Sequence, residues 1–179
     1  PLAERSATFL RSMRFLHLVL CGLGMFIHLL PLEPVTTFWA APDLMIALTF
    51  AWVLRRPDYA PLVFITGAFL LADFLFHRPP GLWAALVLIG SQTLRAKAPD
   101  LSDLTFPMEW LSVATTRIAI TIGYRMVLLI LVIDAPPLPL SLIQVLTTLA
   151  AYPLVVLASQ TVLRVRKIAP GEVDAMRTS

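Results

Sequence analysis

The amino-acid sequence predicts an all-α membrane protein, a single polytopic domain over residues 1–179 that forms a bundle of about six transmembrane helices. Three observations predict it: the composition, a series of apolar runs, and the placement of the basic residues. Apolar residues make up 58% of the chain and charged residues 14%, whereas soluble domains average about 45–50% and about 25%. With 179 residues and about 20 residues per crossing, little sequence remains for a water-soluble domain.

Positive charge alternates between the gaps that separate the apolar runs. Eleven of the 14 Lys and Arg residues fall in every second gap: Arg5, Arg11, Arg14, Arg55, Arg56, Arg95, Lys97, Arg164, Arg166, Lys167 and Arg177. The other gaps hold Arg78, and Arg117 and Arg125 lie inside a run. An excess of Lys and Arg marks cytoplasmic loops, so both termini are expected in the cytoplasm. The net charge of +3 fits the anionic cytoplasmic leaflet better than nucleic acid.

Six runs are long enough to be assigned as crossings. They lie near 14–32, 40–55, 59–77, 81–96, 109–133 and 139–163, with a cytoplasmic tail over 164–179. The second and fourth have only about 16 residues, which is about 24 Å of helix against a hydrocarbon core of about 30 Å. Both are therefore expected to borrow flanking residues or to sit inside the bundle.

Individual runs and one loop have further features that predict their surroundings. On the first, His17, Cys21, Gly24 and His28 form one stripe, which predicts close packing against a neighbouring helix. Trp39, Trp83 and Trp110 lie near run ends, where aromatic residues anchor helices at the membrane interface. The longest loop, near 96–108, ends at Glu109 and is expected to be either a solvated surface or a docking site for a cytoplasmic partner.

Ionisable residues inside the runs are candidates for function, since charges within a bilayer are costly. Counted from their run starts, Asp73 and Arg125 lie at similar heights, about 21 and 24 Å from the cytoplasmic side. Asp43 is a rival partner for Arg125. The alternatives are a ligand or partner site built on this cluster, or a structural ion pair between helices.

The fifth run has a second arginine, Arg117, which shares a helical face with Thr121 and Tyr124. Arg117 is expected to extend toward the cytoplasm or to meet a polar group such as Gln160. The sequence contains no G-x-S-x-G elbow, H-E-x-x-H, P-loop or Asp-rich metal pattern. We therefore expect no enzyme, and neither a metal nor a cofactor.

Three stretches resemble one bacterial family. They are Pro42-Asp43-Leu44 with the run that ends Arg55-Arg56-Pro57, then 67–73 leading into His77-Arg78-Pro79-Pro80-Gly81-Leu82, and Phe106-Pro107-Met108-Glu109-Trp110. In order and spacing they are similar to the rod shape-determining protein MreD family, over nearly the whole chain. The resemblance implies a non-catalytic scaffold of the cell-elongation complex in the bacterial inner membrane. Its implied partners are MreC, the actin-like MreB, the glycosyltransferase RodA and the penicillin-binding transpeptidase, which build the peptidoglycan that maintains rod shape.

The resemblance also implies a fold and an alternative function. The family's fold is similar to the substrate-binding subunits of energy-coupling-factor transporters, so the alternative is a small-molecule-binding subunit of a transporter. For the scaffold, the expected partner surfaces are Asp73, Arg78, Gly81 and the 96–109 loop. Gly81 allows a tight turn, and Arg78 is expected to be available to an acidic group of a partner.

Overall fold

The chain is all-helical in the computed structural model, which describes residues 2–29, 40–102 and 105–161. No strand occurs within these ranges. The elements are α1 (Leu2–Leu29), α2 (Leu44–Arg55), the 3-10 turn η1 (Pro57–Tyr59), α3 (Leu62–Leu75), α4 (Leu82–Ser102), α5 (Phe106–Ile130) and α6 (Leu138–Thr161).

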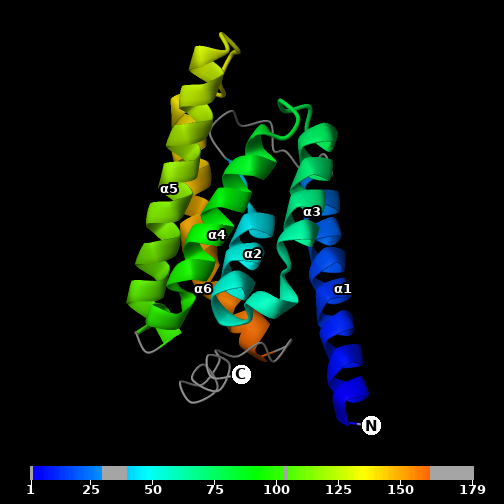
Figure 1. Cartoon of the computed structure of the whole chain (residues 1–179). Coiled ribbons are helices and arrows are strands. Elements are labelled where there is room, and N and C mark those ends of the chain that lie inside the picture. Colours follow the sequence, from blue (N-terminus) through cyan, green and yellow to red (C-terminus); the bar gives the residue numbers. More distant parts are fainter. Residues whose placement is uncertain (1, 30–39, 103–104, 162–179) are drawn as a thin grey trace.

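Consecutive helices run in alternating directions (Figure 1). The start of α1 and the end of α6 therefore lie at one end of the bundle, together with η1; we call this the basal end. The α3–α4 turn and the α5–α6 turn lie at the opposite, apical end. Three helical segments are long and apolar enough to cross a membrane: Thr8–Leu29, Phe106–Ile130 and Leu138–Thr161.

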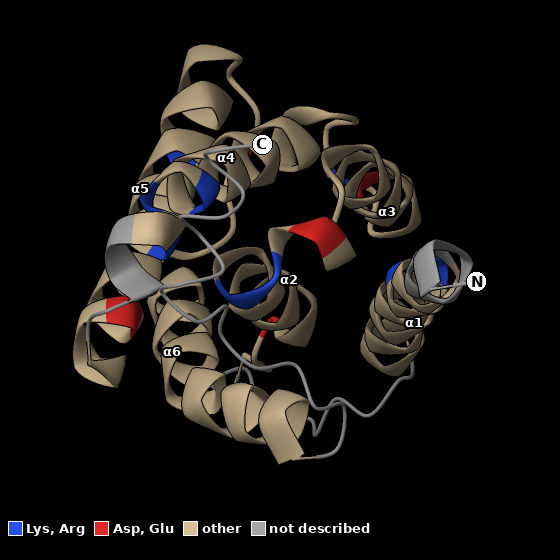
Figure 2. Ribbon diagram, turned by 60° about the horizontal axis from the view of Figure 1, so that its bottom comes forward, with Lys and Arg blue, Asp and Glu red and all other residues tan. Residues whose placement is uncertain are grey.

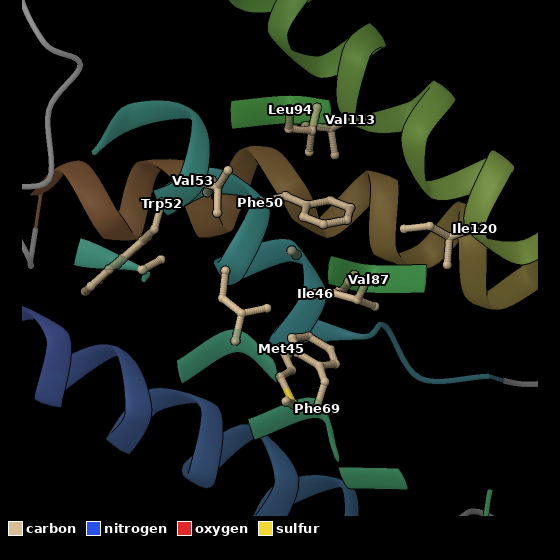
Figure 3. Close-up of a cluster of buried hydrophobic side chains, with 14 of the residues drawn as sticks. Met45, Ile46, Phe50, Trp52, Val53, Phe69, Val87, Leu94, Val113 and Ile120 are labelled. Atoms are coloured by element: carbon tan, nitrogen blue, oxygen red, sulfur yellow. The ribbon is translucent and has the colours of Figure 1, made fainter. Parts of the chain in front are cut away.

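Helix α2 lies in the middle of the bundle, with the other helices arranged around it (Figure 2). Ten of its 12 residues are buried. Its side chains form the core together with residues of α3, α4 and α5, as Figure 3 shows for Ile46, Phe50, Phe69, Val87 and Ile120. The short second run is therefore explained by an interior position.

Large apolar side chains also cover the outside of the bundle. Val63 is 78% exposed, Leu129 73% and Phe15 68%. Soluble monomers rarely present such continuous apolar surface to water. The outer surface is compatible with contact to lipid, in agreement with the predicted membrane character.

The stripe on α1 packs inward at His17, Cys21 and Gly24, as predicted, whereas His28 at its end is exposed. His17 and Cys21 are fully buried, and the His17 ring lies 5.4 Å from the ring of Trp52 on α2. A Cβ placed on Gly24 would lie 3.8 Å from the Cβ of Met45. Small and medium side chains thus let α1 approach α2 closely.

Helix boundaries differ most from the predicted crossings at two places. Helix α1 begins at Leu2, and α4 continues to Ser102 through Pro99. Much of the predicted 96–108 loop is therefore helix. Hydropathy marks where a helix leaves an apolar environment, whereas polar helix formers such as Lys97 continue the backbone hydrogen bonds beyond it. The predicted tail at 164–179 lies outside the described residues.

Candidate functional site

The turn between α3 and α4 is organised by Asp73. Its Oδ2 accepts hydrogen bonds from the backbone N–H of Gly81 at 3.0 Å and of Ala84 at 3.2 Å. The carboxylate thereby satisfies N–H groups at the start of α4, which have no partner within the helix, and its charge suits the positive end of the helix dipole. Gly81 has φ +85, a conformation that glycine adopts without a steric penalty.

The same segment ends α3 with a reversed turn. His77 has φ 52, and the Arg78 N–H donates to the Asp73 carbonyl at 3.0 Å. This bond spans five residues and is typical of a Schellman C-cap. The turn that suggested the family resemblance is therefore a rigid unit that fixes both helix ends.

Asp73 is completely buried, which corrects the expectation that it contacts a partner. It also does not pair with Arg125. Arg125 instead donates to the Pro136 carbonyl at 2.7 Å and to the Ser141 hydroxyl at 3.0 Å, so it holds the α5–α6 turn. Backbone N–H donors near Asp73, and a carbonyl and a hydroxyl acceptor near Arg125, provide hydrogen bonds that the hydropathy pattern does not reveal.

Asp43 is likewise not a partner of Arg125. Its Oδ1 accepts from the Ile46 N–H at 3.1 Å and caps the start of α2. Its own backbone N–H donates to the Thr148 hydroxyl at 2.9 Å, which links α2 to α6. Its role is that of an N-cap residue, whose side chain replaces a missing helical acceptor.

Arg117 points toward α4 and the apical end rather than toward the basal end or Gln160. It is 1% exposed, and its guanidinium carbon lies 5.0 Å from the centre of the Trp83 ring. Its Nη1 donates to the Thr121 hydroxyl at 2.8 Å. The predicted common face of Arg117, Thr121 and Tyr124 is confirmed, because all three line one cavity.

Trp83 is the centre of an aromatic and cationic cluster. The Arg78 guanidinium carbon lies 5.1 Å from its ring centre, and the Tyr124 ring meets it edge-on at 5.1 Å. Arginine over an aromatic face is an attractive cation–π arrangement. Trp83 is buried, so its prediction as an interfacial anchor is wrong; Trp39 lies outside the described residues.

A cavity of about 400 Å³ opens beside this cluster at the apical end. Its lining includes Arg78, Trp83, Arg117, Tyr124, Arg125 and Asp134. Three of these are arginines and one is an acid, so the described wall of the cavity is cationic. Arg78 faces this space and the rings beneath it instead of extending away from the bundle.

A second polar cluster lies near the basal end and joins three helices. Arg55 Nη2 on α2 donates to Glu109 Oε1 and Oε2 on α5, at 3.0 and 3.2 Å. The Tyr152 hydroxyl on α6 donates to Glu109 Oε1 at 3.0 Å. All three side chains are buried. Glu109 is therefore structural. Its partners could not be predicted from the sequence, because they are 54 and 43 residues away.

Trp110 compensates for a proline in the neighbouring helix. Pro153 lies inside α6 and has no N–H to donate to the carbonyl four residues before it. That carbonyl belongs to Leu149, and it accepts a hydrogen bond from Trp110 Nε1 at 3.0 Å. The side chain of Trp110 thus restores a bond that α6 itself cannot make.

Two arginines that lie between the apolar runs of the sequence form hydrogen bonds to the α2–α3 turn at the basal end. Arg95 on α4 donates to the carbonyls of Pro57 at 2.9 Å and Ala60 at 2.7 Å. Arg14 on α1 donates to the Asp58 carbonyl at 2.9 Å. The alternation of charge along the sequence therefore corresponds to a common end of the bundle.

Comparison with protein families, with curated proteins and with solved structures found no match for this chain. Within the described ranges, no group of three or more His, Cys, Asp or Glu side chains is arranged to hold a metal ion.

Proposed function

We propose that this chain is a six-crossing protein of the bacterial inner membrane and a non-catalytic scaffold of the cell-elongation complex, as a member of the MreD family. It binds MreC and through it connects MreB with RodA and the penicillin-binding transpeptidase. In this proposal the fold is of the type found in energy-coupling-factor substrate-binding subunits. The basal end faces the cytoplasm and carries both termini.

Contacts between the segments of the family resemblance support this proposal. Arg55 from the first stretch and Glu109 from the third form a buried ion pair. In the second stretch, Asp73 and Gly81 are joined by a hydrogen bond. Residues that carry the resemblance therefore stabilise the tertiary structure, which is what a shared fold requires of them.

The orientation is supported by arginines at the basal end, since cytoplasmic loops are rich in arginine and lysine. Arg14 and Arg95 bond to the α2–α3 turn, and Arg55 is the last residue of α2. Cysteine labelling tests the orientation, because the native Cys21 is completely buried. Asp134→Cys and Asp58→Cys form a matched pair at exposed apical and basal positions. A membrane-impermeant maleimide applied to spheroplasts should label position 134 alone. Labelling of position 58 alone would reverse the orientation.

The scaffold proposal is tested by co-expression with the MreC protein of the same organism. The tagged chain should retain MreC through affinity and size-exclusion chromatography in mild detergent. A single-crossing protein of the same membrane, expressed at the same level, serves as the control and should be lost. Failure to retain MreC with a folded chain would reject the scaffold function.

A small-molecule-binding membrane subunit is the second candidate, favoured by the apical cavity. Its volume of about 400 Å³ falls in the range of ligand pockets, about 300–1,000 Å³. Mass spectrometry of small molecules released from the purified protein tests this function independently of MreC.

A further inference from the structure

We propose that the apical cavity binds an anion that bears a phosphate group. This inference rests on the second candidate function, that the cavity holds a ligand, and is independent of binding to MreC. The ligand chemistry follows from the hydrogen-bond donors that line the cavity.

Arg117 has hydrogen-bond donor capacity that its neighbours do not satisfy. Its side chain is 1% exposed, lines the cavity, and its Nε has no hydrogen-bond partner in the described structure. The partner of its Nη1 is the neutral hydroxyl of Thr121. A buried guanidinium normally requires a counter-charge or a full set of acceptors. An anion in the cavity would supply both.

Three arginines from separate parts of the chain line the same cavity. Arg78 comes from the α3–α4 turn, whereas Arg117 and Arg125 are two turns apart on α5. Arg78 lies over aromatic rings, and Arg125 contacts a carbonyl and a hydroxyl. None of the three forms an ion pair with a described carboxylate. Planar guanidinium groups match the oxygens of phosphate in paired hydrogen bonds.

The described acids of the apical end form no ion pair with these arginines, although Asp43 and Asp73 lie near enough to Arg117 and Arg78 to attract them electrostatically. Asp134 is the described carboxylate in the lining. Asp73 and Asp43 lie outside the lining and cap α4 and α2. Two sources of phosphate fit the same chemistry: an anionic lipid headgroup from the surrounding bilayer, or a soluble phosphorylated compound.

Reconstitution in nanodiscs tests the proposal and separates the two sources. The protein is placed in phosphatidylcholine nanodiscs with or without phosphatidylglycerol, and inorganic pyrophosphate is the soluble probe. For a lipid headgroup, native mass spectrometry should show retained phosphatidylglycerol, and pyrophosphate should leave the melting temperature unchanged. For a soluble anion, pyrophosphate at about 100 times Kd should raise the melting temperature by about 5–10 °C in phosphatidylcholine alone.

Arg78→Gln and Arg125→Gln are the informative variants, because both side chains are partly exposed and their loss leaves the core intact. Each should reduce retention of the probe at least tenfold. Arg11→Gln, an exposed arginine on α1, should bind as the wild type does. The proposal is overturned if neither probe binds, or if both cavity variants bind like Arg11→Gln. Release of a neutral small molecule would also overturn it, while leaving the second candidate function standing.

Discussion

The buried pair of Arg55 and Glu109 allows a quantitative prediction for Glu109→Gln. The substitution preserves side-chain volume and an acceptor for the Tyr152 hydroxyl, but it removes the charge opposite Arg55. The two side chains are 3% and 1% exposed, so water cannot replace the lost carboxylate. Removal of one partner from a buried ion pair costs about 3–5 kcal/mol. For a chain of this size that lowers the melting temperature by about 6–20 °C.

The double variant Arg55→Met/Glu109→Gln separates charge from packing. It removes both charges, and buried ion pairs replaced by neutral groups are often no less stable than the original. It should therefore recover most of the stability that Glu109→Gln loses, in thermal unfolding of the detergent-solubilised protein. Arg11→Gln is the control for a general effect of arginine loss. These expectations are refuted if Glu109→Gln unfolds within about 0.5 kcal/mol of the wild type, or if the double variant is less stable than Glu109→Gln.

Three further substitutions, one of them with a matched control, test local features by the same unfolding assay. Gly90→Ala should destabilise the protein by about 1–3 kcal/mol, because the added Cβ would lie 2.7 Å from Ile120 Cδ1. The control Gly67→Ala should be neutral or stabilising, because a Cβ at position 67 meets nothing within 4 Å. Equal effects of the two substitutions would contradict the close contact at Gly90. Asp73→Ala should cost about 1–2 kcal/mol through loss of the α4 cap, and unchanged stability would show that the cap is dispensable. Val132→Gly should stabilise the protein by about 1 kcal/mol, because Val132 has φ 56, a backbone conformation in which β-branched residues are strained. A variant less stable than the wild type would argue against that strain.

The sequence predicted the helical class and the approximate position of each helix because hydropathy and proline placement act locally. The interior place of α2 was one of two alternatives left open by its length. The stripe of His17 and Cys21 was also predictable, since residues four apart share a helical face. Helix ends at Leu2 and Ser102 were not, because polar residues extend a helix without an apolar signal.

The partners of the ionisable residues were decided by the tertiary structure. Asp73 and Arg125 lie at similar heights when residues are counted from the run starts. Nevertheless, Asp73 Oδ2 accepts from backbone N–H groups, and Arg125 donates to a carbonyl and a hydroxyl. Glu109 meets Arg55 and Tyr152 from distant helices. Any residue offers a backbone carbonyl or N–H, so a sequence cannot show which one a buried charge will reach. Only the packing of α2, α5 and α6 around one another brings those donors and acceptors within hydrogen-bond distance.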